Sequence, residues 1–171
     1  MVAVSDQLSH DPTALDWSPN GKFIVLGDRN GVMKSLDATT LKVIDTFDSA
    51  LANKSSAWVE DIKVSPDCKY VAFGTHGGLS KIDIAKIDDS GMLIKYSSCG
   101  TLMLSSALIS LDWTLDSENV IVNSQAAELK WLNVTSKTQV FASSAKNFEY
   151  QSWSCRFGWP VQGIWPGKDY T

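Results

Sequence analysis

A short apolar run that leads into a turn occurs three times in this chain, at nearly equal spacing. The three copies are 14–19 (ALDWSP), 61–66 (DIKVSP) and 110–115 (SLDWTL). Pro19 and Pro66 are 47 residues apart, and Trp17 and Trp113 are 96 residues apart, twice 48. A strand-rich unit that recurs every 40–50 residues is typical of the blades of a β-propeller.

Each unit also contains four runs of strand length. Aromatic and β-branched residues alternate with polar ones, and clusters of Asn, Asp, Gly, Ser and Pro separate the runs, as in short strands joined by turns. No stretch has sustained helical periodicity. We therefore predict an all-β chain that forms an incomplete WD-repeat β-propeller, with three four-stranded antiparallel blades and an irregular Trp-rich tail. The expected strands are 13–17, 23–26, 32–36, 43–47, 59–64, 70–73, 79–84, 92–96, 108–113, 120–122, 128–134 and 139–142.

Three blades are too few for a closed ring, because closed propellers have about 4 to 8 blades. We expect a piece of a longer protein, or a ring completed by another chain, and we expect the open apolar blade faces to self-associate. The expected division is a lead-in (1–11), three blades (12–50, 51–99 and 100–146) and a Trp-rich segment that leads into a truncated fourth blade (147–171).

The hydrogen-bonded relay of His, Ser or Thr, Asp and Trp that typical WD-repeat blades bury is degraded here. Trp131 is the only tryptophan in a third-strand position, and Asp28 is the only Asp well placed between second and third strands. His76 and Gln125 occupy that turn in the other two blades. His10 could act as the loop histidine for Asp28, although His10 and His76 more simply read as partly exposed loop residues. Blade stability should then come mostly from apolar packing.

Composition favours an ordinary globular protein of the cytoplasm. The chain is 44% hydrophobic and carries a net charge of −4, which leaves no basic surplus for nucleic-acid phosphates. We expect no membrane partner, because the sequence has neither a secretory signal nor an apolar run of membrane-spanning length. Cys68, Cys99 and Cys155 fit no disulfide or zinc spacing and are expected to be reduced structural thiols.

Catalytic, metal and cofactor sites are not expected. The two histidines lie 66 residues apart, no Ser occupies a G-x-S-x-G elbow, and no phosphate-binding Gly loop precedes a helix. A noncatalytic scaffold is therefore favoured. A propeller portion of an enzyme, such as a hydrolase cap or a quinoprotein-type dehydrogenase, and a generic WD-repeat scaffold for another protein stay open as alternatives.

Partner binding is expected in the loops, because function concentrates in loops carried by a rigid scaffold. The turns between second and third strands and the connectors between blades (49–57 and 99–106) should share one edge of the propeller. The candidate contact residues in those turns are Asp28, Arg29, Asn30, Thr75, His76 and Gln125.

The tail from Tyr150 to Pro166 contains three of the chain's seven tryptophans within 13 residues. Large aromatic residues with Gly and Pro indicate a rigid, irregular segment that buries much area per residue. We expect Trp153 and Trp165 to be buried against the third blade. The alternative is an exposed aromatic patch that binds a partner.

This tail resembles a segment of the echinoderm microtubule-associated protein-like family, whose run W-x-x-x-x-C-x-L-G-F-x-V-x-G-x-W-P interrupts the C-terminal propeller. Upstream, 105–113 and 123–131 are similar to that family's S-S-F-I-T-H-L-D-W and N-S-x-D-Y-E-I-L-Y-W. The chain departs from the family in the closer spacing of Trp153 and Cys155 and in Phe157 and Trp159, where the family has Leu and Phe. The residues taken as structural signature are Trp17, Trp113, Trp131, Trp153, Gly158, Gly163, Trp165 and Pro166.

The resemblance implies part of the second of two fused propellers in a microtubule-associated protein, with tubulin or microtubules as partner and the cytoskeleton as location. The heptads of the coiled coil that family members usually carry are absent from this sequence. The chain would therefore supply only a share of the family's function.

Overall fold

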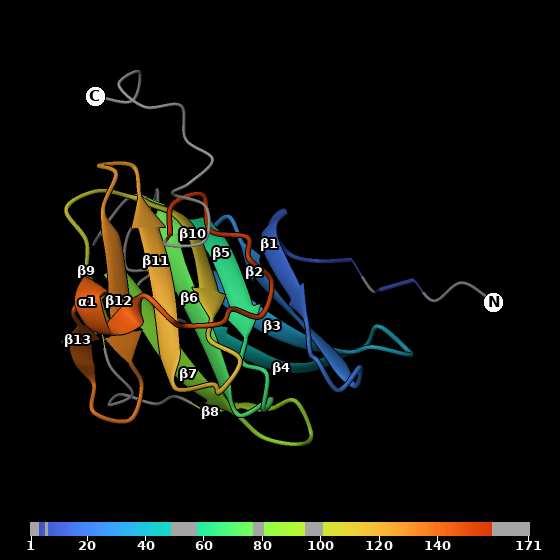
Figure 1. The fold of residues 1–171 in the computed structure, drawn as a ribbon. Helices are drawn as coiled ribbons and strands as arrows, with labels where there is room; N and C mark the ends of the chain where they lie inside the picture. Colours follow the sequence, from blue (N-terminus) through green and yellow to red (C-terminus); the bar gives the residue numbers. More distant parts are fainter. Residues whose placement is uncertain (1–3, 6, 49–57, 77–80, 95–100, 159–171) are drawn as a thin grey trace.

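The computed structural model describes residues 4–5, 7–48, 58–76, 81–94 and 101–158 of the chain. These residues form three antiparallel sheets that lie side by side and do not close into a ring (Figure 1). Blade 1 contains β1 (Pro12–Trp17), β2 (Phe23–Asp28), β3 (Val32–Asp37) and β4 (Val43–Asp48). Blade 2 contains β5 (Trp58–Val64), β6 (Tyr70–His76), β7 (Lys81–Ile87), β8 (Leu93–Ile94) and β9 (Thr101–Met103). Blade 3 contains β10 (Leu108–Trp113), β11 (Asn119–Ser124), β12 (Leu129–Asn133) and β13 (Thr138–Val140).

The structure confirms the predicted fold class, with differences at two outer edges. In blade 2 the outermost strand consists of two short pieces, since β8 pairs with the end of β7 and β9 pairs with its beginning. The third strand of this blade runs to Ile87, beyond the predicted end at Ile84. In blade 3 the last strand ends at Val140, and a single helical turn, α1 (Ala142–Ala145), follows.

The first hairpin turn has the same hydrogen bonds in every blade. A hydroxyl at the end of the inner strand accepts a hydrogen bond from the N–H five residues later, at 2.9–3.0 Å, and donates to the second residue after it. The residue that follows has a positive φ in all three turns: 71° for Gly21, 58° for Cys68 and 62° for Ser117. The hydroxyls belong to Ser18, Ser65 and Thr114, and their acceptors are Asn20, Asp67 and Asp116.

Three apolar layers hold the sheets together. One lies between blades 1 and 2 and contains Phe23 and Ile62, and the next lies between blades 2 and 3 and contains Ile84 and Trp113. The third covers the far face of blade 3 with residues of the tail. We call the face of a blade that points to the preceding blade its leading face, and the opposite face its trailing face.

Hydrogen bonds between blades recur with nearly the period of the sequence repeat. They join groups 46–50 residues apart in the chain. One example is Asp16, whose carboxylate accepts from the N–H of Val64 at 2.7 Å, and another is Trp113, whose indole N–H donates to the carbonyl of Lys63 at 2.8 Å. The repeat in sequence is therefore a repeat of contacts across blade boundaries.

Candidate interaction surface

The turns between second and third strands place three of the expected contact residues at equivalent positions. Register along the strands aligns Arg29, His76 and Gln125, one in each blade. Arg29 N donates to the carbonyl of Asp11 at 3.1 Å, and Gln125 N donates to that of Ala107 at 2.9 Å. In blades 1 and 3 each turn therefore lies beside the chain that enters its own blade. We call this edge of the three blades the turn edge.

In blade 2 the turn edge carries an aromatic pair. His76 stacks on Trp58, with ring centroids 4.2 Å apart and planes 9° apart. The indole N–H of Trp58 donates to Glu60 at 2.7 Å, and His76 Nδ1 lies 3.7 Å from the same carboxylate oxygen. Because Trp58 and His76 are directly opposite in the β5–β6 ladder, the backbone fixes this stack. His76 was an expected contact residue, whereas its partners Trp58 and Glu60 were not predicted from the sequence.

Beneath that row, a second set of equivalent residues is buried: Asp28, Thr75 and Ser124. The Oδ1 atom of Asp28 accepts from the N–H groups of Asn30 and Val32 at 2.9 and 3.0 Å, which shapes the turn. Its Oδ2 atom is buried and has no hydrogen-bond partner among the described residues. Asp28 and Thr75 are therefore parts of the scaffold under the turn edge, whereas Arg29 and Asn30 are exposed on it.

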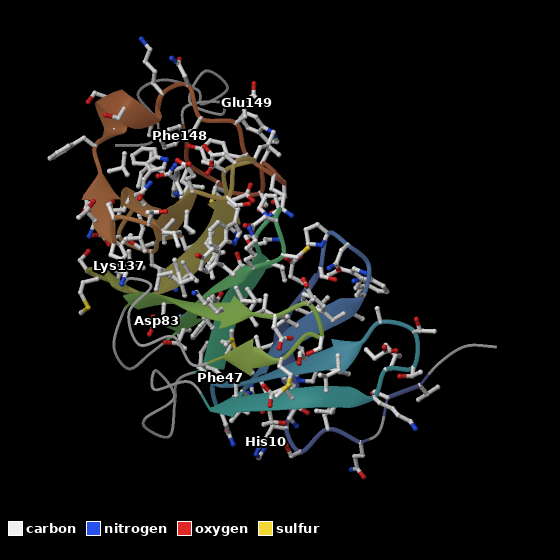
Figure 2. All side chains as sticks on the ribbon, turned by 90° about the horizontal axis from the view of Figure 1, so that it is seen from below. His10, Phe47, Asp83, Lys137, Phe148 and Glu149 are labelled. Atoms are coloured by element: carbon white, nitrogen blue, oxygen red, sulfur yellow. The ribbon has the colours of Figure 1, made fainter. Side chains whose placement is uncertain are left out.

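The suggested pairing of His10 with Asp28 is wrong. His10 is exposed and lies at the periphery of blade 1 (Figure 2). The Oδ1 atom of Asp28 accepts only backbone N–H groups of its own turn, and its Oδ2 atom has no hydrogen-bond partner among the described residues, which include His10. The simpler reading of His10 as a loop residue is the one that the structure supports.

Glu128 braces the turn edge in blade 3, and sequence reasoning did not identify it. Its carboxylate accepts from Ser105 N at 2.8 Å and from Ser124 Oγ at 2.7 Å, and it pairs with Lys130 at 2.7 Å. Partial burial works to raise the pKa of Glu128, but the hydrogen bonds from Lys130, Ser124 and Ser105 outweigh it and lower the pKa to about 2. The turn that carries Gln125 is thereby fixed to the chain that enters the blade.

The inner strands carry carboxylates that join one unit to the next. Asp61 accepts from the N–H of Leu111 at 2.9 Å, and Asp112 accepts from the N–H of Ser152 at 3.1 Å. Burial raises the pKa of Asp61 to about 6, although the hydrogen bond from Leu111 and the charge of Lys63 oppose it. These groups accept backbone hydrogen bonds between units. Within the described ranges, no three His, Cys, Asp or Glu side chains gather in a way that could hold a metal ion.

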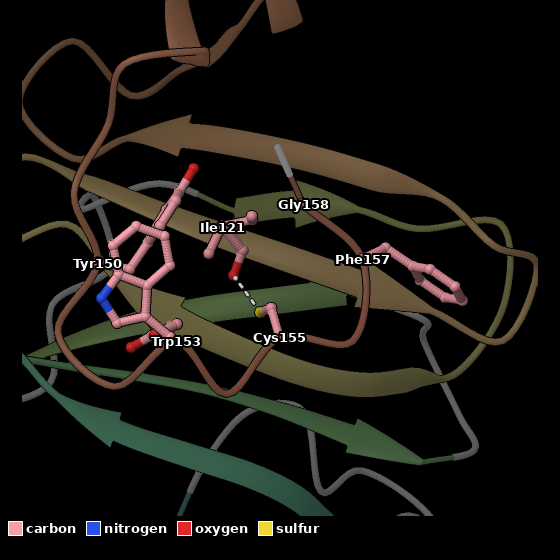
Figure 3. Close-up of a pocket in the computed structure, with 7 residues that line it drawn as sticks. Ile121, Tyr150, Trp153, Cys155, Phe157 and Gly158 are labelled. Carbon is pink, nitrogen blue, oxygen red and sulfur yellow. Dashed lines mark hydrogen bonds between the residues drawn. The ribbon is translucent and has the colours of Figure 1, made fainter. Parts of the chain in front are cut away.

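Residues 150–158 form a strap across the trailing face of blade 3. Asn123 accepts from Phe157 N at 2.8 Å and donates to the Phe157 carbonyl at 3.1 Å. The indole of Trp131 donates to the hydroxyl of Tyr150 at 2.8 Å, and the thiol of Cys155 lies 3.9 Å from the carbonyl of Ile121 (Figure 3). The strap thus lies where a following blade would pack.

The expected burial of Trp153 is wrong, since this residue is 49% exposed. Tyr150 and Cys155 fill the buried positions of the strap, and the Trp153 ring packs edge-to-face with the ring of Tyr150, with centroids 5.3 Å apart. The backbone at Trp153 has a φ of 54°, in the left-handed region that non-glycine residues rarely adopt. Gly163, Trp165 and Pro166 lie outside the described residues.

The signature tryptophans of the blades differ in their surroundings. Trp113 and Trp131 are buried, whereas Trp17 is 52% exposed. Cys68 and Cys155 are free and buried, while Cys99 and the connector 49–57 lie outside the described residues. In the part of the chain that the structure describes, no helix has the length and apolar character needed to cross a membrane.

Sequence comparison finds relatives that align with nearly the whole chain. Echinoderm microtubule-associated protein-like 2 of Mus musculus is 31% identical over 158 residues, or 91% of this chain, and protein-like 1 of Homo sapiens is 27% identical over 172 aligned positions, or 98%. The chain resembles the echinoderm microtubule-associated protein-like proteins. The resemblance expected from the tail is confirmed and extends to protein-like 3 of Mus musculus, at 28% identity. The chain spans about a fifth of the length of these relatives: 23%, 20% and 18%. No protein-family model matches it.

Solved structures confirm the fold. The β-propeller domain of Myceliophteria thermophila Cps50 (Swd1) superposes on 78% of this chain with a TM-score of 0.63 and 13% identity. The WD40 repeats of RRP9 superpose on 80% with a TM-score of 0.63 and 16% identity. In both cases this chain covers 39% of the other chain. The described sheets therefore correspond to part of a WD-repeat propeller.

Proposed function

We propose that this chain is part of a noncatalytic WD-repeat scaffold that binds tubulin or microtubules in the cytoplasm through its turn edge. The observation that carries the proposal is the alignment of 91–99% of the chain with proteins named for association with microtubules. Residues 12–50, 51–99 and 100–146 would be three successive blades, although β9 at the start of the third range pairs with β7 of blade 2, and 147–171 would lead into a fourth. Because the chain spans about a fifth of its relatives, it would supply only part of their binding surface.

The geometry of the turn edge supports this surface over the opposite edge. Arg29, His76 and Gln125 hold equivalent positions in adjacent blades, so a partner can contact all three at once. The turns beneath them are held by hydrogen bonds to Asp28 and Glu128, which limits the conformational entropy lost on binding.

Co-sedimentation of the chain with stabilised microtubules tests the proposal. We expect the chain to pellet with microtubules, and the double variant Arg29→Glu/His76→Glu to pellet at least about tenfold more weakly, equivalent to about 1.4 kcal/mol. Lys22→Glu is the matched control, because Lys22 is exposed in the first hairpin turn, at the opposite end of blade 1.

Two results would count against the proposal. Absence of the unmodified chain from the pellet would reject microtubules as its partner. Equal weakening by Lys22→Glu and by the double variant would show that binding does not use the turn edge.

A further inference from the structure

The inner strand of each blade contains a β-bulge at the same place, close to where the strand begins. The bulged residue is Thr13 in blade 1, Glu60 in blade 2 and Ile109 in blade 3. A bulge re-aims a side chain, and bulges are frequent beside functional sites. Thr13 donates to the carbonyl of Val59 at 2.6 Å and so joins two blades, whereas Ile109 is apolar. Glu60 is therefore the one charged side chain among the three bulges.

Glu60 has one carboxylate oxygen without a partner. Its Oε2 atom accepts from the Trp58 indole and lies near His76, but its Oε1 atom has no hydrogen-bond or ion-pair partner among the described residues. Glu128, which braces blade 3, differs, because its Oε2 atom accepts two hydrogen bonds and its Oε1 atom pairs with Lys130. The side chains of Glu60 and His76 are each 30% exposed, so a partner can reach them.

The cluster of Trp58, Glu60 and His76 has the chemistry of a site for a cation. The ion pairs among the described residues include none between Glu60 and a lysine or arginine. A carboxylate beside aromatic rings attracts a positive group, because the carboxylate charge and the ring faces act together. An arginine guanidinium fits this combination, since it is planar, stacks on aromatic rings and directs several N–H donors at a carboxylate. A lysine ammonium is more strongly hydrated and has no plane to lay against a ring.

We propose that Trp58, Glu60 and His76 bind an arginine side chain of the partner at the turn edge. The guanidinium pairs with the Oε1 atom of Glu60 and stacks on the exposed part of the Trp58–His76 pair. The indole N–H of Trp58 holds the carboxylate in place before the partner arrives, which reduces the entropy lost on binding. This inference rests on the proposed function, because it takes the turn edge as the partner-binding surface.

Titration of the isotope-labelled chain with a blocked Gly-Arg-Gly peptide, followed by NMR of the indole N–H groups, tests the site. The Trp58 resonance is identified by its loss in Trp58→Phe. We expect this resonance to shift saturably with the arginine peptide. The matching citrulline peptide, a neutral isostere, should bind at least about fivefold more weakly, because it cannot form the charged pair.

Two variants assign the effect to the carboxylate. Glu60→Gln keeps an acceptor for the Trp58 N–H and should weaken binding of the arginine peptide at least about fivefold. Glu118→Gln, which neutralises an exposed carboxylate in blade 3, is the matched control and should bind as the parent chain does. Far-UV circular dichroism and thermal melting check that each variant is folded.

Three results would overturn the proposal. Equal affinities for the arginine and citrulline peptides would show that charge is not recognised. Unchanged binding by Glu60→Gln would remove the carboxylate from the site. Equal shifts of all indole resonances would show that the peptide binds without a specific site.

The peptide titration and the co-sedimentation assay fail separately. A chain that pellets with microtubules but does not distinguish the two peptides keeps its proposed function and loses the arginine site. A chain that distinguishes the peptides but does not pellet keeps the arginine site and loses microtubules as its partner.

Discussion

Asn123 and Phe157 bind each other through two hydrogen bonds across 34 residues of sequence, at 2.8 and 3.1 Å. The carboxamide of Asn123 presents an acceptor and a donor to the backbone of the strap, as a neighbouring strand would. Asn123 is fully buried, so loss of its side chain would leave the N–H and carbonyl of Phe157 without these partners. The attachment of the strap to blade 3 depends on this pair.

Asn123→Ala should loosen the strap and expose Cys155. Two lost hydrogen bonds at a buried site should cost about 1–3 kcal/mol. In the parent chain burial raises the pKa of the Cys155 thiol, which keeps it protonated and slow to alkylate. We expect alkylation of Cys155 in the native state to become about tenfold faster or more in the variant. Mass spectrometry of iodoacetamide-treated protein measures this, and the rate at Cys68, buried in another layer, is the control. Equal rates at Cys155 in both proteins would mean that the pair does not hold the strap.

Trp113 and Trp153 should differ sharply in their contribution to stability. Trp113 is completely buried between blades 2 and 3 and bonds the Lys63 carbonyl, so Trp113→Ala should cost about 3–5 kcal/mol. Trp153→Ala removes an edge contact with Tyr150 and should cost about 1 kcal/mol. Urea unfolding followed by circular dichroism compares the two. A loss of similar size in both variants would contradict the exposed placement of Trp153.

Asp61 should make the chain less stable as pH rises from about 4 to 6. Its folded-state pKa of about 6 lies above the ordinary value, so the folded chain favours the protonated carboxyl, and this advantage disappears once the pH exceeds the folded-state pKa. The melting temperature of Asp61→Asn should therefore rise relative to that of the parent chain as the pH increases over this range. Thermal melts at pH 4, 5, 6 and 7 measure the difference.

Asp37→Asn is the control for that experiment. Hydrogen bonds from the backbone N–H and the hydroxyl of Thr40 lower the pKa of Asp37, so its contribution is complete above the ordinary carboxyl pKa and falls only in acid. Its difference from the parent should not increase between pH 5 and 7. A pH-independent difference for Asp61→Asn would show that Asp61 is not the titrating group.

Glu128→Gln should destabilise blade 3 at neutral pH. The variant keeps one acceptor oxygen for Ser105 N and Ser124 Oγ but loses the charge that pairs with Lys130, at a cost of about 1–3 kcal/mol. Because hydrogen bonds lower the pKa of Glu128 to about 2, its contribution is present above the ordinary Glu pKa and is lost as pH falls toward 2. Urea midpoints at pH 7 measure the loss, and Glu118→Gln, at an exposed position, is the control. Equal midpoints for all three proteins would rule out Glu128 as a brace.

Sequence patterns were sufficient to predict most strands, because the alternation of apolar and polar residues and the turn-forming residues reflect local structure. The repeated Ser or Thr in the first hairpin turn, with Asn or Asp two residues later, makes the same bonds wherever it occurs. The turn at Leu115–Glu118 was also predictable, although it lacks both the Pro and the Gly of blade 1.

Tertiary contacts between residues far apart in the sequence were not predictable in this way. Trp17 and Trp113 occur in nearly identical sequences, yet Trp17 is 52% exposed and Trp113 is buried in the layer against blade 2. Trp153 was expected in the core because of its size, yet it is 49% exposed, and Tyr150 and Cys155 occupy the buried positions of the strap. Glu128 was not identified, because its partner Ser105 lies 23 residues earlier, in the connection that leads into β10.

The packing partner that each blade accepts on its trailing face is set by one position of its second strand. Gly27 and Gly74 occupy it in blades 1 and 2, where a Cβ atom would lie 2.4 Å from Val59 or 2.6 Å from Leu108 of the next blade. Asn123 occupies the same position in blade 3 and fills that space with a carboxamide. The units are therefore not interchangeable modules: a duplicated copy of blade 2 could be spliced in ahead of blade 3, but not behind it. Lengthening this protein by design therefore has a favoured direction, because the Asn123 carboxamide and the strap bonded to it both occupy the space behind blade 3.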